Sequence, residues 1–266
     1  MIKTKKSLGQ HFLKSKDIIS AIAGAGYIRA SDIVLEIGPG EGTLTKTLLK
    51  LAGRVIAVEK DRRLIPVLKE KFSNEIKSGN LELIEKDILE LDMSKGIFDS
   101  KRYKLIANIP YYITGQIIRK FLETENQPEL MVLLVQKEVA ERIMARGGKE
   151  SLLSLSVKAF GDPKIVRTVK RGSFAPAPKV DSAVLSIENI SKKRLGGISE
   201  KLFFEVLHAG FAHKRKQLLP NLSVLFPKEI LIKAFKNVNI ELKARAEDIS
   251  LPKWLKLCKT LHSGIE

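Results

Sequence analysis

The sequence has only one cysteine, Cys258, among its 266 residues. An intrachain disulfide bond and a zinc site built from several cysteines are therefore excluded. The four histidines show no HExxH pattern or other metal-ligand spacing. The sequence thus predicts no metal, and the helical spacing of Cys258 with Trp254 and Leu255 assigns the cysteine to a buried core position.

Long hydrophobic runs are also missing. The longest wholly apolar stretch covers residues 130–135, whereas a membrane-spanning helix needs about 20 residues. The N-terminus, Met1-Ile2-Lys3-Thr4-Lys5-Lys6, has no apolar region of the kind found in secretory signals. We therefore expect a cytoplasmic protein that makes no membrane contact, and we expect a monomer.

Positive charge, in contrast, is abundant. The chain carries 47 Lys and Arg against 30 Asp and Glu, a formal net charge of +17. Such an excess favours a polyanionic partner, because each neutralised phosphate releases condensed counterions. Nucleic acid is the leading candidate. A membrane surface is the rival partner, which the shortness of the apolar runs disfavours.

Residues 34–49 predict a strand, a tight turn and the start of a helix. The turn has glycine at positions 38, 40 and 42, where the backbone can adopt positive φ and a ligand can approach the main chain. A dinucleotide-binding fingerprint would need a further glycine at Thr43. The observed spacing after Glu36 is more typical of an S-adenosylmethionine (SAM) site, with a nicotinamide or flavin nucleotide as the alternative.

Two later strands are predicted to end in carboxylates. Glu59 follows a buried strand and lies 21 residues after Gly38, the distance at which nucleotide-binding α/β folds place an acceptor for ribose hydroxyls. Asp87 ends the next strand and is a candidate acceptor for the adenine amine. The alternative for Asp87 is a cap on the following turn.

The stretch Asn108-Ile109-Pro110-Tyr111 follows the fourth predicted strand. The Asn108 side-chain carbonyl is an uncharged acceptor, and Pro110 restricts the backbone so that several carbonyls can converge on one amino group. Two acceptors would localise the lone pair of an adenine amine, and Tyr111 can stack on an extruded base. This stretch therefore predicts methyl transfer to an exocyclic amine.

These patterns predict an α/β fold, a doubly wound sheet spanning residues 1–190, followed by a small helical domain at 191–266. The second part begins at a basic, glycine-bearing linker and has 15 Lys and Arg against 7 Asp and Glu, a net +8. Its cluster His213-Lys214-Arg215-Lys216 suits a phosphate backbone, or is a solvated helix face. Residues 151–157 fit a helix or a strand equally well.

Three shorter stretches of the chain carry further expectations. A helix starting at Asp17 as N-cap should precede the first strand of the sheet. Phe174 lies in a proline-rich loop, as either a stacking plate or a core anchor. Lys3, Lys5 and Lys6 are either a solvated tail or phosphate contacts.

Taken together, the motifs resemble the small-subunit ribosomal RNA adenine N6,N6-dimethyltransferase family along nearly the whole chain. The matching stretches are residues 8–13 (LGQHFL), 36–40 (EIGPG), the strand-end Glu59 and Asp87, residues 108–111 (NIPY), 174–182 (FAPAPKVDS) and 211–216 (FAHKRK). Their order and spacing make the resemblance specific. The family often has asparagine at the positions of His11 and Tyr112.

The resemblance implies a Rossmann-like SAM-dependent methyltransferase that releases S-adenosylhomocysteine. The residues it implies for SAM binding are His11, Leu13, Gly38, Glu59, Asp87 and Asn108. The catalytic residues it implies are Asn108, Pro110, Tyr111 and Phe174, with the two aromatic rings holding the target base between them.

The target that the resemblance implies is two adjacent adenosines in a hairpin loop near the 3′ end of small-subunit rRNA, within a late pre-ribosomal particle. One alternative is a large-subunit rRNA adenine methyltransferase of the macrolide-resistance type. Another is a non-catalytic RNA-binding assembly factor. A nucleotide-dependent oxidoreductase is disfavoured, because hydride transfer has no use for the Asn-Ile-Pro-Tyr stretch.

Overall fold

The computed structural model describes residues 11–93 and 102–263. The chain divides into two compact units, each of them discontinuous in sequence. The first consists of Met1–Ala140 and Asp162–Ile190, and the second of Glu141–Gly161 and Ser191–Glu266. Residues 141–161, which the sequence analysis places in the first domain, group with the second unit, whose other segment begins at residue 191.

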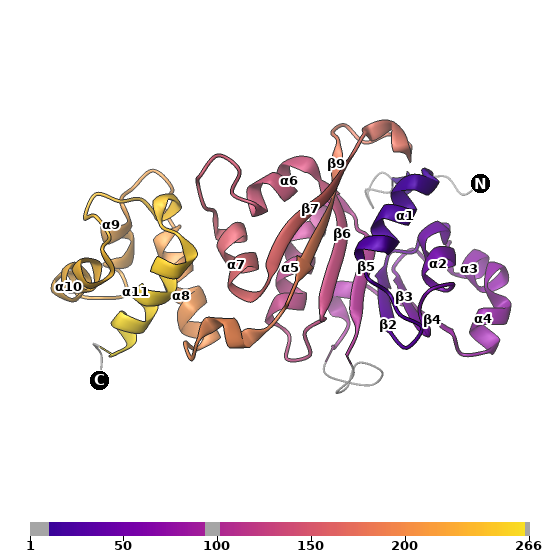
Figure 1. Cartoon of the computed structure of the whole chain (residues 1–266), viewed down its shortest axis with the longest axis horizontal. Coiled ribbons are helices and arrows are strands. Elements are labelled where there is room, and N and C mark those ends of the chain that lie inside the picture. The colour runs from indigo at the N-terminus through magenta and orange to yellow at the C-terminus, as the bar shows by residue number, and fades with distance from the viewer. Residues whose placement is uncertain (1–10, 94–101, 264–266) are drawn as a thin grey trace. The chain divides into compact units, whose positions relative to one another are not determined.

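The first unit contains a seven-stranded sheet with the order β4-β3-β2-β5-β6-β9-β7 (Figure 1). The strands are β2 (Ile33–Ile37), β3 (Arg54–Glu59), β4 (Leu81–Glu85), β5 (Lys104–Asn108), β6 (Leu130–Gln136), β7 (Asp162–Val169) and β9 (Ser182–Glu188). The strands from β4 to β6 in this order pair in parallel, and β9 pairs antiparallel with both β6 and β7. The Rossmann-like fold class is thus confirmed.

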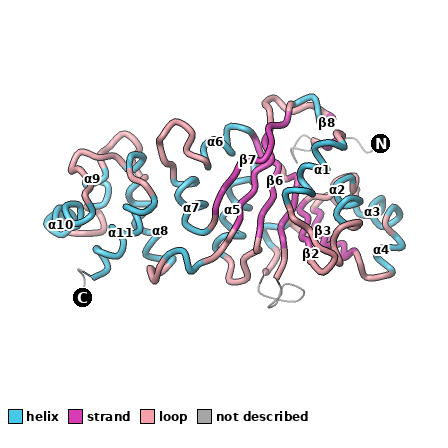
Figure 2. The backbone as a smooth tube through the Cα atoms, viewed as in Figure 1, coloured by secondary structure: helices cyan, strands magenta, loops and turns pink. Residues whose placement is uncertain are grey.

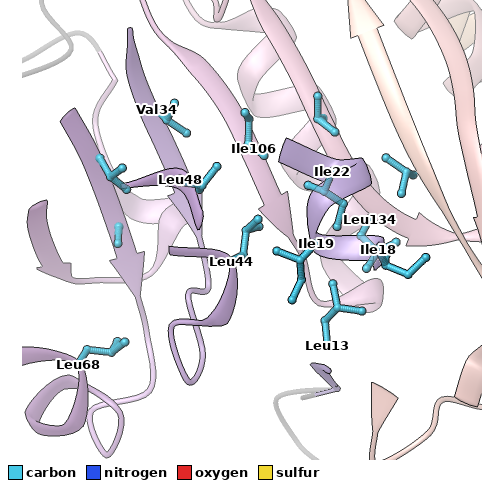
Figure 3. Close-up of a cluster of buried hydrophobic side chains, with 14 of the residues drawn as sticks. Leu13, Ile18, Ile19, Ile22, Val34, Leu44, Leu48, Leu68, Ile106 and Leu134 are labelled. Carbon is cyan, nitrogen blue, oxygen red and sulfur yellow. The ribbon is translucent and has the colours of Figure 1, made fainter. Parts of the chain in front are cut away.

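Two helices near the N-terminus cover one face of this sheet. Figure 3 shows Ile19 and Ile22 of α1 (Lys16–Ala25) and Leu44 of α2 (Thr43–Leu48) among the buried side chains around the strand residues Val34 and Ile106. The intervening strand residues point to the opposite face and are fully buried as well. The central strands are therefore covered on both faces, which explains why apolar residues follow one another in them without alternation, Glu36 in β2 being a buried exception.

The remaining helices of the first unit follow β3, the Asn-Ile-Pro-Tyr stretch and β6. They are α3 (Ile65–Lys71), α4 (Ser73–Lys77), α5 (Thr114–Glu123) and most of α6 (Lys137–Ile143). The expected N-cap of α1 is wrong, because Ser15 holds that position and Asp17 lies in the first turn, where it pairs with Arg167 at 3.0 Å. An ion pair 150 positions apart in sequence could not be read from local spacing.

A short pair of strands joins the start of the described chain to the proline-rich loop. Strand β1 (Phe12–Leu13) pairs antiparallel with β8 (Phe174–Ala175), so that Leu13 faces Phe174 in register. The Lys14 N–H also donates to the Ser173 carbonyl at 3.0 Å. The segment beginning at His11 is therefore attached to the first unit near the carboxyl ends of its strands.

The second unit has helices and turns but no strand within its described residues (Figure 2). Its helices are the end of α6, α7 (Leu152–Phe160), α8 (Glu200–Gly210), α9 (Leu218–Leu222), α10 (Lys228–Val238) and α11 (Leu251–Ser263). The side chain of Ser199 accepts from the Leu202 N–H, as expected of the N-cap of α8. Cys258 is buried, as predicted, beside the equally buried Trp254.

Helix α7 resolves the ambiguity at residues 151–157. A capping box formed by Ser151 and Ser154 starts the helix. At its end, the Phe160 ring stacks on Phe204 of α8 at a centroid distance of 5.9 Å. These aromatic contacts explain why residues 141–161 group with the C-terminal helices.

Candidate active site

A cavity of about 440 Å³ lies at the carboxyl ends of the parallel strands of the first unit. The chain order reverses between β2 and β5, and such a switch point is where open α/β sheets bind their ligands. The volume falls within the range of about 300–1,000 Å³ typical of small-molecule sites. The predicted residues that line the cavity are His11, Gly38, Glu59, Asp87, Asn108, Pro110 and Tyr111.

The glycine turn after β2 forms one wall. Gly38 has a φ of +65°, and its N–H donates to the Val58 carbonyl at 2.9 Å, which fixes the turn to the end of β3. A Cβ atom added at Gly38 would meet no heavy atom within 4 Å, so the turn borders open space. A ligand can therefore approach the backbone here without steric hindrance.

Glu59 lies beside this turn and is only 6% exposed. Its Oε1 accepts from the Asp61 N–H at 2.8 Å, and its Oε2 accepts from the Gly40 N–H at 3.2 Å. Burial raises the pKa of Glu59 above its ordinary value, although these two backbone hydrogen bonds oppose the rise. Each oxygen keeps a second lone pair, so Glu59 can still accept from two ribose hydroxyls.

Asp87 has two partners in the structure. Its Oδ1 accepts from the Leu89 N–H at 3.0 Å and so caps the turn Ile88–Glu90, as the alternative interpretation expected. Its Oδ2 accepts from Lys60 Nζ at 2.6 Å. Burial alone would raise the pKa of Asp87, but the bonds from Lys60 and Leu89 outweigh it and hold the pKa below the ordinary value. Contact with an adenine amine remains a prediction.

Asn108 and Tyr111 meet the N-terminal segment at His11. The Asn108 Nδ2 donates to the His11 carbonyl at 3.2 Å, which leaves Oδ1 as the acceptor of this amide. The Tyr111 ring stacks on the His11 ring at a centroid distance of 5.8 Å, and its hydroxyl lies 2.5 Å from Ser182 Oγ. His11 Nδ1 in turn donates to the Pro176 carbonyl at 2.8 Å. These contacts hold both predicted catalytic side chains in place.

Two predicted residues do not line the cavity. Leu13 and Phe174 are 6% and 5% exposed and belong to the hydrophobic core cluster. The structure therefore gives Phe174 the core-anchor position that was its alternative. Contact of Leu13 with SAM and of Phe174 with a base remain predictions. Lys3, Lys5, Lys6 and residues 8–10 of the LGQHFL motif lie outside the described residues.

The cavity also contains residues that the sequence motifs did not single out. Among these are Lys60, Lys86, Tyr112 and Gln116. Their positions in the sequence could have indicated three of them. Lys60 directly follows the predicted site residue Glu59. Tyr112 and Gln116 follow Pro110 and are four positions apart, the spacing that places two residues on one side of a helix. Lys120 does not line the cavity, but it supports the chain that does. Its Nζ donates to the carbonyls of Leu89 and Leu91 at 3.2 and 2.7 Å.

The basic cluster predicted for RNA contact lies in the second unit. His213-Lys214-Arg215-Lys216 follows α8, and all four side chains are exposed. Beneath them, the buried Asn221 donates through Nδ2 to the carbonyls of Gly210 and His213, at 2.7 and 3.2 Å. The cations thus project from a turn whose backbone is held by a buried amide.

The cavity matches the chemical requirements of SAM. Gly38 offers open space along the backbone for the amino-acid end, and Glu59 offers carboxylate acceptors for the ribose. Apolar side chains, among them Val58, Ile88 and Leu89, provide walls for an adenine ring. Fold and cavity together define a SAM-dependent methyltransferase.

The family model described as "Ribosomal RNA adenine dimethylase" matches residues 1–263, and the chain belongs to this family. A relative in Dehalococcoides mccartyi, Ribosomal RNA small subunit methyltransferase A, is 42% identical over 97% of this chain and 88% of its own length. A protein of the same name in Fusobacterium nucleatum subsp. nucleatum is 40% identical over 97% of each chain. The chain is thus a SAM-dependent enzyme.

Two solved structures resemble the fold over most of the chain. A dimethyladenosine transferase from Plasmodium falciparum aligns with a TM-score of 0.79 and 31% identity, covering 93% of this chain and 96% of its own. The 23S rRNA methyltransferase ErmE aligns with a TM-score of 0.76 and 27% identity, covering 94% and 99%. The oxidoreductase alternative is excluded by these findings.

Two kinds of feature are absent from the described ranges. No helix within residues 11–93 and 102–263 has the length and apolar character needed to cross a bilayer. In the same ranges, no group of three or more His, Cys, Asp or Glu side chains is arranged to hold a metal ion.

Proposed function

We propose that this enzyme dimethylates N6 of two adjacent adenosines in a 3′-terminal hairpin loop of small-subunit rRNA, on a late pre-ribosomal particle. Support for the target comes from relatives at 40–42% identity that are named for the small subunit. Support for the chemistry comes from Asn108, whose amide is oriented by the His11 carbonyl at the cavity wall.

Asn108 is the residue that acts on the attacking amine. SAM, when bound, supplies an electrophilic methyl group. Because Nδ2 of Asn108 is engaged by His11, its Oδ1 accepts a hydrogen from the adenine amine. In the first transfer a backbone carbonyl of the segment 109–110 accepts the other hydrogen, and in the second transfer only one N–H remains to be held. After each transfer the nitrogen releases one proton to solvent. Two acceptors localise the nitrogen lone pair and aim it at the donor, so catalysis comes from positioning and electrostatics and needs no charged base in the attack.

Tyr111 receives the extruded target base in this proposal. Its hydroxyl contact with Ser182 fixes the ring, and His11 supports one face of it. A base stacked on a ring held in this way loses little further freedom on binding, which favours the reactive geometry.

The basic turn at residues 213–216 provides phosphate contacts outside the cavity. Its four exposed side chains and the net charge of +17 support a polyanionic substrate. We place the enzyme in the cytoplasm as a monomer that acts on the particle without a membrane.

A large-subunit target is the second candidate, because ErmE aligns over 94% of this chain. Its identity of 27% is well below the 42% of a relative named for the small subunit. The small-subunit target is therefore the better supported of the two.

The test is nucleoside mass spectrometry after incubation of the protein and SAM with unmethylated small-subunit particles. Large-subunit RNA and the Asn108→Ala variant serve as controls. We expect N6,N6-dimethyladenosine only in small-subunit RNA and only with Asn108 present. Dimethyladenosine in large-subunit RNA would favour the second candidate, and no product on particles that a known methyltransferase modifies would refute the proposed function.

A further inference from the structure

The two consecutive tyrosines at the cavity have very different surroundings. Tyr111 is half-buried, its ring stacks on His11, and its hydroxyl contacts Ser182. Tyr112 also lines the cavity but is 59% exposed. It has no hydrogen-bond or ring-stacking partner among residues 11–93 and 102–263.

Exposure of an aromatic ring at the mouth of a cavity needs an explanation. Among the described residues, two tyrosine side chains are exposed, Tyr112 and Tyr27, the latter at 64%. Of these two, Tyr112 lines the cavity and Tyr27 does not. It belongs to the tight turn Tyr111–Ile113, whose backbone is restricted by Pro110 at its start. The ring is therefore held at the rim by a stiff backbone, while its faces stay open to solvent.

The rim around Tyr112 is cationic. Lys60 and Lys86 both line the cavity, as Tyr112 does, and both lysine side chains are exposed. Lys60 is engaged by Asp87 at 2.6 Å, whereas the Lys86 ammonium has no such ion pair among the salt bridges of the described residues. An open aromatic ring and a lysine that line one cavity are the combination by which proteins bind single-stranded nucleic acids, with a base on the ring and a phosphate on the cation.

We infer that Tyr112 is the stacking platform for the nucleotide adjacent to the target adenosine, with Lys86 as the partner of its phosphate. Extrusion of one base into the cavity removes a stacking partner from its neighbour, and the Tyr112 ring replaces that partner at the rim. Tyr111 and Tyr112 then divide the work: the first holds the base that reacts, and the second holds the base beside it. This inference rests on the proposed function, because it requires an RNA strand at the cavity.

The first experiment measures stacking directly and independently of methylation. A short single-stranded RNA carries 2-aminopurine next to an adenosine, on its 5′ side in one probe and its 3′ side in the other. We expect the protein to quench one of the two probes and Tyr112→Ala to abolish this quenching, while Tyr112→Phe and Tyr112→Trp retain it. Tyr27→Ala is the matched control, since it removes an equally exposed ring away from the cavity.

The second experiment compares methylation of small-subunit particles by the same variants. Tyr112→Ala should lower kcat/KM by between about fivefold and 150-fold, the range typical of one base stacked on an aromatic ring. SAM affinity and the thermal midpoint should stay as in the unmodified protein, because the side chain is exposed. Tyr112→Phe should lose less than about threefold, and Lys86→Ala should weaken RNA binding chiefly at low salt.

Several results would overturn the inference. These are unchanged quenching in Tyr112→Ala, an equal loss in Tyr112→Phe, or a parallel loss of SAM affinity that would make Tyr112 part of the cofactor wall. Failure of the proposed function has a different signature. Quenching that depends on Tyr112 without any dimethyladenosine in the particles would keep the platform and reject the reaction.

Discussion

The cavity of the first unit and the basic turn of the second unit hold their polar groups in opposite ways. In the cavity, Glu59 and Asn108 each have defined hydrogen-bond partners, and Glu59 is only 6% exposed. In the basic turn, the cations of residues 213–216 are all exposed, and the buried polar group is the amide of Asn221 beneath them.

This difference separates two kinds of recognition. A buried polar group with fixed partners recognises individual hydrogen-bonding atoms of a ligand. Replacing one of these atoms leaves the buried group without a hydrogen-bond partner. An exposed cluster of basic side chains binds a polyanion through its total charge. Its members can replace one another, because water and salt screen each of them. Substitutions should therefore have large, specific effects near the cavity and small, additive effects at the basic turn.

The largest effect is expected at Glu36, which lies in β2 just before the glycine turn and is 1% exposed. Burial, together with the charge of Glu59, raises the pKa of Glu36 from 4.5 to about 8. Between these values the folded protein keeps a proton that the unfolded chain loses, so the free energy of unfolding falls as pH rises. The slope is about 1.4 kcal/mol per pH unit.

Urea unfolding of Glu36→Gln and the unmodified protein at several pH values from about 5 to 8 measures this contribution. As pH rises, the free energy of unfolding of the variant should increase relative to that of the unmodified protein by about 1.4 kcal/mol per pH unit, because the amide does not titrate. Glu70→Gln, which removes an exposed carboxylate, serves as control. Parallel pH profiles for all three proteins would contradict the buried, protonated state of Glu36.

The next largest effect is expected for SAM affinity in Glu59→Ala. Loss of a charged acceptor costs about 1.5–3 kcal/mol, so the Kd should rise roughly 10- to 150-fold. Glu85 is the matched control, because it lies in register beside Glu59 at the end of β4 but does not line the cavity. Calorimetric titration with SAM measures both variants, and similar losses in the two would show a general effect of charge at the sheet edge.

Asn221→Ala tests the buried group beneath the basic turn. Two hydrogen bonds to the Gly210 and His213 carbonyls are lost, which should lower the free energy of unfolding by about 1–3 kcal/mol. All charges of the turn remain in this variant. A loss of RNA affinity at temperatures well below thermal unfolding would therefore show that RNA binding depends on the backbone conformation of the turn. A variant with unchanged thermal unfolding would show that this amide does not hold the turn.

The smallest effect is expected for Lys214→Ala. One exposed cation lost from a phosphate contact should weaken RNA binding only a few-fold and reduce the slope of log K against log salt by about 0.7–0.9. Lys214→Arg should bind like the unmodified protein. RNA binding measured across a salt series checks both variants. If Lys214→Arg lost as much RNA affinity as Lys214→Ala, the turn would recognise specific side-chain atoms, as the cavity does, and not charge alone.

The sequence predicted those parts of the site that depend on local geometry. The strand, glycine turn and helix at residues 33–48 follow from residue type and spacing, and the position of Glu59 follows from its distance to Gly38. Both are short-range consequences of the parallel sheet. They account for the glycine turn and the buried carboxylate that line the cavity.

Long-range packing accounts for what the sequence did not predict. The sequence left two positions open for Phe174, and the pairing of β8 with β1 places the side chain in the core. Asp17 is in the first helical turn and pairs with Arg167. Tyr112 is exposed and Tyr111 half-buried although both line the cavity, because Tyr111 packs on His11 and contacts Ser182. None of these arrangements has a signature in the residues immediately around it.

The discontinuity of the second unit bears on how the chain is made. Helix α7 leaves the ribosome well before α8 and α11, whose side chains cover it in the finished protein. At about 5–20 residues per second, synthesis of the roughly 100 residues after Phe160 takes roughly 5–20 s. During that interval α7 lacks the partners that α8 and α11 provide in the finished protein.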